Sequence, residues 1–287
     1  MEYFDYVRYQ DRFLEAKDDY NNAKIVIIGA PMDFTVSFRP GTRFGPKKIR
    51  EVSYGLESYS VYTDDSLENK KFFDAGDADI PFGNVEKSLD ILENITEKIL
   101  EDEKIPLYLG GEHLISYPII KKVAEKYPDL VVLHFDAHAD LRDTYFGEKL
   151  SHATVLRRIS EHIKDKHIFH FGIRSGVREE FLYAQQHTHM YPIEVKTPFL
   201  NVLQDLKNRP IYITLDIDVV DPAFAPGTGT PEPGGCNSQE ILEVVSHFKS
   251  LNVVGFDLVE VSPANDLSDR TSLLAAKILR ELLIGLG

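Results

Sequence analysis

The chain has 287 residues, and its hydrophobic content of 43% and charged content of 27% are ordinary for a globular protein. Its formal net charge of −14 disfavours binding to nucleic acid or anionic membranes and favours a cationic ligand. Met1–Tyr20 contains no apolar run, and no stretch reaches the roughly 18 apolar residues that a membrane span needs. We therefore expect neither a signal peptide nor a transmembrane helix, and we predict a cytoplasmic protein. The single cysteine, Cys236, cannot form an internal disulfide and is interpreted as a residue without a function.

Apolar, β-branched runs recur along the chain, with helix-like segments between them. Continuous runs such as Ile25–Ile28 are typical of strands that are covered on both faces. Val85–Glu103 has the clearest helical spacing of apolar residues. The predicted strands are Lys24–Ala30, Lys71–Asp74, Ile105–Leu109, Leu130–Phe135, His167–Gly172, His189–Ile193, Ile211–Leu215 and Asn252–Asp257. The predicted helices are Pro46–Glu57, Val85–Glu103, Ile115–Lys126, Ala153–His162, Ser238–Phe248 and Arg270–Leu286.

This alternation of strands and helices indicates βαβ crossovers and a mostly parallel sheet between helical layers. The sequence has no Ser/Gly linker, charge block or internal repeat that would divide it. We therefore predict a single α/β domain over residues 1–287.

The first polar cluster follows the predicted strand Ile105–Leu109. Gly110 and Gly111 permit a sharp turn, after which His113 projects from the loop. A single histidine near a strand end is more often a hydrogen-bonded structural residue, so His113 alone indicates little.

The second cluster, His134–Asp140, follows the predicted strand Leu130–Phe135. Asp136, His138 and Asp140 are two residues apart, so an extended backbone places them on one side. Two acids and a histidine on one face need a compensating charge, which a divalent cation supplies most directly. His134 shares this spacing but lies in the apolar run, and we interpret it as a core residue behind the site.

The third cluster, Asp216 and Asp218, repeats the alternating pattern after Ile211–Leu215, whereas Asp221 precedes a proline and is interpreted as a turn residue. The three clusters together offer more ligands than one ion needs and suit two ions that share carboxylates. The absence of cysteine from this set favours Mn²⁺ over a thiolate-bound zinc, and such ions lower the pKa of a shared water. The candidate metal ligands are His113, Asp136, His138, Asp140, Asp216 and Asp218.

Two further residues are candidates for substrate binding and proton transfer. Glu260, just past the last predicted strand, could bind a guanidinium through two hydrogen bonds, or it could be a surface acid. His152 could move protons between solvent and a leaving amine, or it could be a structural residue in a first helical turn. The residue types alone favour neither interpretation in either case.

These motifs resemble the ureohydrolases, the family of arginase and agmatinase. Gly110–His113, Asp136–Asp140 and Asp216–Asp218 look like its three metal-binding signatures in the same order, and the similarity continues through Asp221–Thr230 and Val259–Pro263. The resemblance extends from about Gly29 to the C-terminus and is strongest to bacterial agmatinases. The segments that resemble that branch are Gly29–Asp33, Phe38–Pro46, Phe73–Asp77 and Phe171–Gly176.

The resemblance implies a three-layer α/β/α domain with an eight-stranded parallel sheet, assembled as a homotrimer or homohexamer. It implies one manganese on His113, Asp136, Asp140 and Asp216, and a second on Asp136, His138, Asp216 and Asp218. A hydroxide between the ions would attack the guanidinium carbon of agmatine and yield putrescine and urea. Glu260 would orient the guanidinium, Asp140 would pass a proton to the departing amine, and His152 would carry it onward.

The substrate depends on segments outside the metal motifs. Leu141–Lys149 does not resemble the Asn- and Ser-bearing loop with which arginase reads the α-carboxylate of arginine, and the acidic composition suits dicationic agmatine. Many agmatinases have Tyr-Asp-His where this chain has Asn265-Asp266-Leu267. Arginine, guanidinobutyrate, guanidinopropionate and formiminoglutamate are therefore alternative substrates of the same chemistry.

Two hypotheses lie outside this class. A single-zinc amide hydrolase on the related deacetylase fold needs only two aspartates and one histidine, which would leave His113, Asp140 and a second bridging acid surplus. A non-catalytic scaffold derived from the enzyme predicts a lost ligand or a replaced Glu260, and neither change is present.

Overall fold

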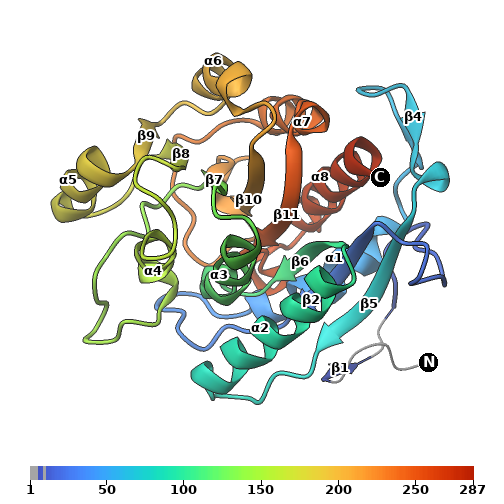
Figure 1. The fold of residues 1–287 in the computed structure, drawn as a ribbon, viewed down its shortest axis with the longest axis horizontal. Helices are drawn as coiled ribbons and strands as arrows, with labels where there is room; N and C mark the ends of the chain where they lie inside the picture. The colour runs from blue at the N-terminus through green and yellow to red at the C-terminus, as the bar shows by residue number, and fades with distance from the viewer. Residues whose placement is uncertain (1–5, 9–10) are drawn as a thin grey trace.

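The computed structural model describes residues 6–8 and 11–287. A nine-stranded sheet lies at its centre, in the order β1-β5-β2-β6-β11-β10-β7-β8-β9 (Figure 1). Its strands are β1 (Val7–Arg8), β2 (Ile25–Ala30), β5 (Phe72–Ala78), β6 (Ile105–Gly110), β7 (Val131–Phe135), β8 (Ile168–Ile173), β9 (His189–Pro192), β10 (Pro210–Asp216) and β11 (Asn252–Val259). Each of the eight predicted strands corresponds to one of β2 and β5 to β11, and all neighbours among these are parallel. The short β1 is an addition that pairs antiparallel with β5.

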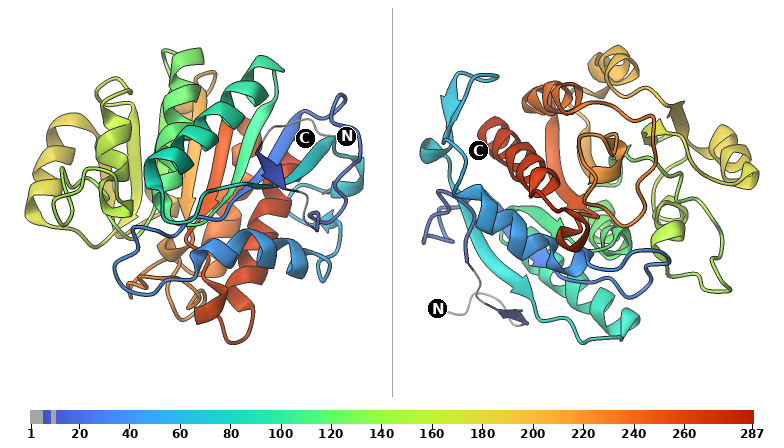
Figure 2. Two further views of the ribbon diagram at one scale, coloured as in Figure 1. Left: turned by 90° about the horizontal axis from the view of Figure 1, so that it is seen from below. Right: turned by 180° about the vertical axis from the view of Figure 1, so that it is seen from behind.

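Helices cover both faces of the sheet, as the two views of Figure 2 show. Packing between neighbouring helices defines the layers: α2 contacts α3 and α3 contacts α4, while α1 and α7 both contact α8. Successive residues of β2 enter opposite cores, Ile25 and Ile27 on one side and Val26 and Ile28 on the other. The helices are α1 (Gly45–Ser53), α2 (Val85–Glu101), α3 (Ser116–Lys126), α4 (Val155–Ser160), α5 (Arg178–His187), α6 (Lys196–Leu206), α7 (Ser238–Ser246) and α8 (Arg270–Leu286). The predicted three-layer α/β/α architecture is therefore confirmed.

The sequence did not predict two of these helices, α5 and α6. In α5 only Glu180 and Ala184 are buried, so the helix lacks the apolar stripe by which an amphipathic helix is identified. In α6 the buried residues are few as well, and a proline stands at its third position. The sequence also did not predict the two-residue strands β3 (Tyr59–Ser60) and β4 (Asp65–Ser66), which form a separate hairpin.

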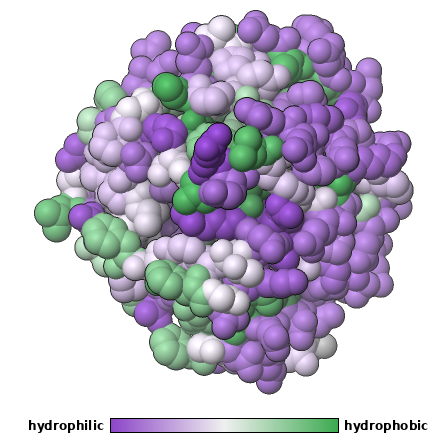
Figure 3. Space-filling model, turned by 90° about the vertical axis from the view of Figure 1, so that its left-hand side faces the viewer, coloured by the Kyte–Doolittle hydropathy of each residue, from purple (hydrophilic) through white to green (hydrophobic). Residues whose placement is uncertain are grey.

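The surface agrees with the charged composition. Polar residues predominate on the face shown in Figure 3, and hydrophobic residues lie there in small separate groups. In the described part of the chain, no helix combines the length and the apolar content that crossing a bilayer requires.

Candidate active site

The candidate site residues follow the carboxyl ends of four strands that are neighbours in the sheet. His113 follows β6, Glu260 follows β11, Asp216 ends β10, and the segment Asp136–Asp140 follows β7. Parallel strands end at the same edge of a sheet, so these segments meet although they are far apart in the sequence. The pairing order β6-β11-β10-β7 thus explains why the polar clusters converge.

We call the six candidate metal ligands, His113, Asp136, His138, Asp140, Asp216 and Asp218, the metal cluster. One half of it surrounds the His113 ring. Its Nδ1 lies 3.0 Å from Asp136 Oδ2, 3.3 Å from Asp140 Oδ2 and 3.5 Å from Asp216 Oδ2. All four side chains are buried. The structure therefore brings together the four residues that the sequence analysis assigned to one ion.

The other half surrounds the His138 ring. Its Nδ1 lies 3.0 Å from Asp218 Oδ2 and 3.6 Å from Asp136 Oδ1. Asp136 thus faces His113 through one oxygen and His138 through the other. The Asp216 carboxylate accepts a hydrogen bond from the Asp218 backbone N–H at 2.8 Å, which fixes the turn that carries both acids.

The charges of the cluster are unbalanced. The pKa of Asp216 lies well above its ordinary value because the group is buried and faces Asp218 and Asp136. Burial and the nearby Asp136 raise the pKa of Asp140 to about 7. Burial opposes protonation of His113, but contacts with Asp136, Asp140 and Asp216 outweigh it and raise its pKa. In the protein without metal, bound protons neutralise part of the negative charge of these acids. Divalent cations would displace those protons.

The residues present fit a pair of cations. Two of the buried ligand atoms, His113 Nδ1 and Asp218 Oδ2, have a neighbouring ligand atom at 3.0 Å but make no well-aligned hydrogen bond in the described part of the chain. A buried polar atom without a well-aligned hydrogen bond loses part of its stabilisation, which a bound cation would restore. One such atom lies in each half of the cluster. Ligand atoms of Asp136, His138 and Asp218 lie within 4.8 Å of one another, as do those of His113, His134 and Asp136.

His134 lies behind the cluster, where the sequence analysis placed it. Its Nε2 is 2.8 Å from Asp136 Oδ2 and its Nδ1 is 2.8 Å from His170 Nδ1. Burial lowers the pKa of both imidazoles, so each carries one N–H at neutral pH. With His134 donating to Asp136 through Nε2, its Nδ1 accepts from His170. The side chain therefore orients Asp136, and we do not count it as a metal ligand.

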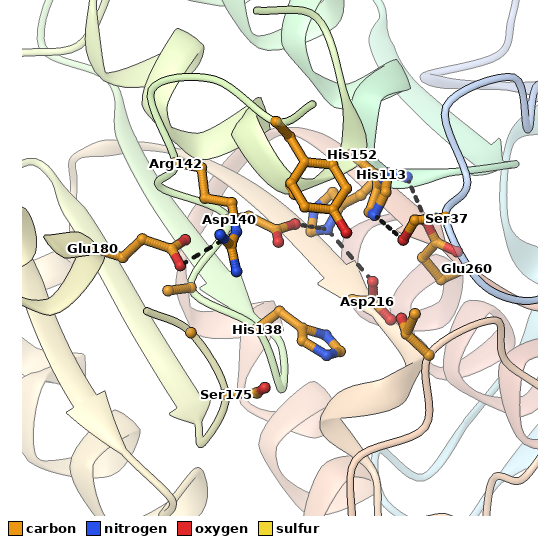
Figure 4. Close-up of a pocket in the computed structure, with 15 residues that line it drawn as sticks. Ser37, His113, His138, Asp140, Arg142, His152, Ser175, Glu180, Asp216 and Glu260 are labelled. Atoms are coloured by element: carbon orange, nitrogen blue, oxygen red, sulfur yellow. Dashed lines mark hydrogen bonds and ion pairs between the residues drawn. The ribbon is translucent and has the colours of Figure 1, made fainter. Parts of the chain in front are cut away.

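A cavity of about 220 Å³ opens beside the cluster. Figure 4 shows Glu260 and Ser37 at one side of it, Glu180 and Arg142 at the opposite side, and His138 between them. The sequence analysis had proposed functions for six of its lining residues, namely His113, His138, Asp140, His152, Asp216 and Glu260. The remaining lining residues are Ser37, Ala139, Arg142, Tyr145, Ala153, Ser175, Gly176, Glu180 and Thr230.

Some of these remaining residues carried a usable signal in the sequence. Arg142 and Tyr145 belong to the loop that was compared with that of arginase, and they were overlooked as individual side chains. Glu180 lies on α5, which was not predicted. Ser37 is far in the sequence from every strand end that carries a metal motif.

Glu260 is buried, and its backbone is strained. Its φ of +66° lies in the left-handed region, and the other site residue with such a backbone is Asp140, at +52°. Its Oε1 accepts a hydrogen bond from the His113 N–H at 2.8 Å, and its own N–H donates to the Gly111 carbonyl at 2.9 Å. These contacts hold the carboxylate against His113, so the interpretation of Glu260 as a surface acid was wrong.

His152 lines the cavity at the start of a short 3₁₀ turn, His152–Thr154. Its N–H donates to the Thr35 hydroxyl at 3.0 Å, and its Nε2 lies 3.4 Å from the Ser37 hydroxyl. Its ring meets the Tyr145 ring edge to face at 5.6 Å. Burial lowers its pKa to about 4, so the imidazole is neutral at pH 7.

The segment Asn265-Asp266-Leu267 and the single cysteine, Cys236, both lie outside the cavity. None of Asn265, Asp266 and Leu267 lines it: Asp266 accepts hydrogen bonds from Ser272, and Leu267 is fully exposed. Cys236 is buried with its thiol 3.6 Å from the Val219 carbonyl, and burial raises its pKa to about 12. The thiol is therefore protonated and inert at neutral pH.

Comparisons with known proteins identify the family of the chain. The chain matches the model of the Arginase family over residues 23–285. It is 51% identical to an agmatinase of Bacillus cereus over 276 residues, which cover 95% of each chain. It is 40% identical to a human mitochondrial guanidino acid hydrolase, with 90% of this chain and 77% of that protein covered. The crystal structure of an agmatine ureohydrolase of Thermoplasma volcanium superposes with a TM-score of 0.88 at 33% identity, covering 97% of this chain and 94% of the other. The chain therefore belongs to the arginase family and is an enzyme of the ureohydrolase type.

Proposed function

We propose that this enzyme hydrolyses agmatine to putrescine and urea and that it uses two Mn²⁺ ions per chain. The observation that carries the proposal is the position of Asp136 between His113 and His138, beside a cavity that Glu260 lines. The identity of 51% to an agmatinase supports the choice of substrate. A donor set of imidazoles and carboxylates, with no thiolate, favours manganese.

The proposed ligands follow the two halves of the cluster. His113, Asp136, Asp140 and Asp216 would hold one ion, and Asp136, His138, Asp216 and Asp218 would hold the other. Bound together, two such ions polarise a substrate and lower the pKa of water, which supplies a nucleophile near neutral pH.

The remaining groups would bind the substrate and move protons. Glu260 Oε1 already accepts the His113 N–H, so its second oxygen can accept hydrogen bonds from a guanidinium. Asp140, which lines the cavity beside the cluster, would give a proton to the departing amine. The neutral His152, at the same cavity, would exchange protons with solvent.

A guanidino acid is the second candidate substrate. Arg142 lines the cavity and could accept a carboxylate tail, and one relative is a guanidino acid hydrolase. Arg142 Nε, however, already lies 3.7 Å from Glu180 Oε2, so its charge is partly balanced. Glu180 places an acid at the same end of the cavity, which suits the ammonium tail of agmatine better than a carboxylate tail, and we therefore favour agmatine.

The test is product release by the metal-stripped protein after addition of Mn²⁺. Agmatine, arginine, 4-guanidinobutyrate and 3-guanidinopropionate are compared by urea release, and formiminoglutamate by formamide release. We expect two manganese ions per chain and the highest kcat/KM with agmatine. A preference for another substrate would overturn the assignment of agmatine, and full activity without metal would overturn the chemistry. The predicted cytoplasmic location and the homotrimer or homohexamer stay predictions.

A further inference from the structure

The Arg174 side chain uses all its hydrogen-bond donors on backbone carbonyls. A guanidinium has five N–H groups, and this one makes five hydrogen bonds. Nε donates to Glu232 O at 3.1 Å, and Nη2 donates to Glu232 O and Asp218 O, both at 2.7 Å. Nη1 donates to Gly172 O at 3.1 Å and to Val219 O at 3.2 Å. Among the residues that the structure describes, no acid forms an ion pair with it.

These carbonyls belong to the segments that build one half of the metal cluster. Asp218 and Val219 lie on the 3₁₀ turn Ile217–Val219, directly after β10. Glu232 lies on the following loop, which also contributes Thr230 to the cavity. The guanidinium thus ties the Asp218 turn to this loop and to the end of β8.

The backbone around Arg174 holds the other segment of that half. The N–H groups of Arg174 and Ser175 donate to Ala137 O at 2.8 and 2.9 Å, and Ala139 N–H donates to Ser175 O at 3.0 Å. Ala137 N–H in turn donates to Asp218 Oδ1 at 3.0 Å. His138, between these alanines, is thereby fixed opposite Asp218.

We propose that Arg174 is a positioning residue for the cation between His138 and Asp218. It contacts neither the cavity nor a proposed ligand's side chain, and it acts by holding the Asp218 turn at the correct distance from His138. Lysine has three donors on one atom and cannot span carbonyls from three segments. In the half around His113, the histidine itself is anchored separately, through β6 and the contact of His113 N–H with Glu260, whereas Asp136 and Asp216 belong to both halves.

The inference rests on the two-cation site of the proposed function, and metal titration separates the two. Metal-stripped wild-type protein and R174K are titrated with MnCl₂ by calorimetry, and bound manganese is counted after gel filtration. We expect two ions on the wild type. On R174K we expect one ion with unchanged affinity and a second bound roughly 10- to 100-fold more weakly, the usual loss when a group that orients a ligand is removed.

R280K is the matched control. Arg280 is buried on α8, where its Nη1 donates to the Glu57 carbonyl at 2.8 Å and its Nη2 contacts Glu281, with no link to the metal segments. We expect R280K to unfold at a lower denaturant concentration than the wild type and to bind both ions with wild-type affinity. This result would separate a positioning effect from a general loss of stability.

A second variant keeps the test decisive if R174K does not fold. A Cβ at Gly235 would lie 2.5 Å from Val219 O and 2.7 Å from both Arg174 Nη2 and Asp221 N, so G235A disturbs the Asp218 turn together with its contact to the guanidinium. It must show the same selective weakening of one ion. Two ions with wild-type affinities on either folded variant would overturn the positioning role, as would equal weakening of both ions. If the wild type itself binds fewer than two ions, the two-metal function fails instead.

Discussion

Replacement of Glu260 by glutamine tests the proposed guanidinium contact most directly. Glu260 Oε1 accepts the His113 N–H, and a glutamine carbonyl can take over this bond. The glutamine NH₂ then faces the guanidinium. Both groups are hydrogen-bond donors, so no hydrogen bond can form between them. Burial raises the pKa of Glu260 well above its ordinary value in the metal-free protein, and a bound guanidinium would favour the ionised form. The variant would thus lose a charged acceptor, and a hydrogen bond to a charged group contributes about 1.5–3 kcal/mol. At about 1.4 kcal/mol for each factor of ten, kcat/KM for agmatine should fall by roughly 10- to 150-fold.

The assay is steady-state urea release by E260Q, with bound manganese measured in the same sample. Both ions should remain, because Glu260 is not among the proposed ligands. E148Q is the control, since Glu148 is an exposed acid that does not line the cavity, and its kinetics should match the wild type. Wild-type kcat/KM in a fully metallated E260Q would refute the contact, and loss of manganese would show that Glu260 supports the metals instead.

The other predictions concern the metal, the core and pH. D218A should bind one manganese per chain and lose several orders of magnitude in kcat; two bound ions would contradict the ligand assignment. R50A should lower the free energy of unfolding by about 3–5 kcal/mol in a denaturant titration, because it leaves the carboxylates of Asp74 and Asp77 buried without their cation. Burial holds the pKa of His152 at about 4 in the folded protein, below its ordinary value of 6.5. Between pH 4 and pH 6.5, the unfolded chain therefore binds a proton at this histidine that the folded chain does not bind. This histidine therefore lowers stability as pH falls from about 6.5 to 4, and metal-free H152Q should lose less unfolding free energy than the wild type over this window; equal slopes would refute the burial argument.

The metal cluster was predictable because its pattern is local. Asp136, His138 and Asp140 carry their spacing within five residues, and the strand before them identifies the sheet edge to which they belong. Only the knowledge that this strand, β7, lies three places from β6 in the sheet was missing, and the observed topology supplies it. Short-range periodicity and a general rule about strand ends were thus sufficient to predict that these candidate ligands lie together.

The far side of the cavity could not be predicted in this way. Glu180 is held there by hydrogen bonds from Leu141 N–H and Val177 N–H, both at 2.8 Å, and nothing within α5 marks the acid as buried. The contacts of Arg174 with residues 44 to 58 positions away depend on tertiary structure alone. Residues that act through distant backbone groups leave no periodic trace in a sequence.

The left-handed backbone of Asp140 and Glu260 has a consequence for engineering. Glycine adopts this conformation without the penalty of about 1–2 kcal/mol that an L side chain incurs, so D140G or E260G would relax the fold at those points while deleting an acid from the cavity. A selection for heat resistance alone would tend to enrich variants such as D140G and E260G, which lack an acid that the proposed mechanism needs. Stabilising libraries for this enzyme should therefore keep both codons fixed and diversify the outer faces of its helices.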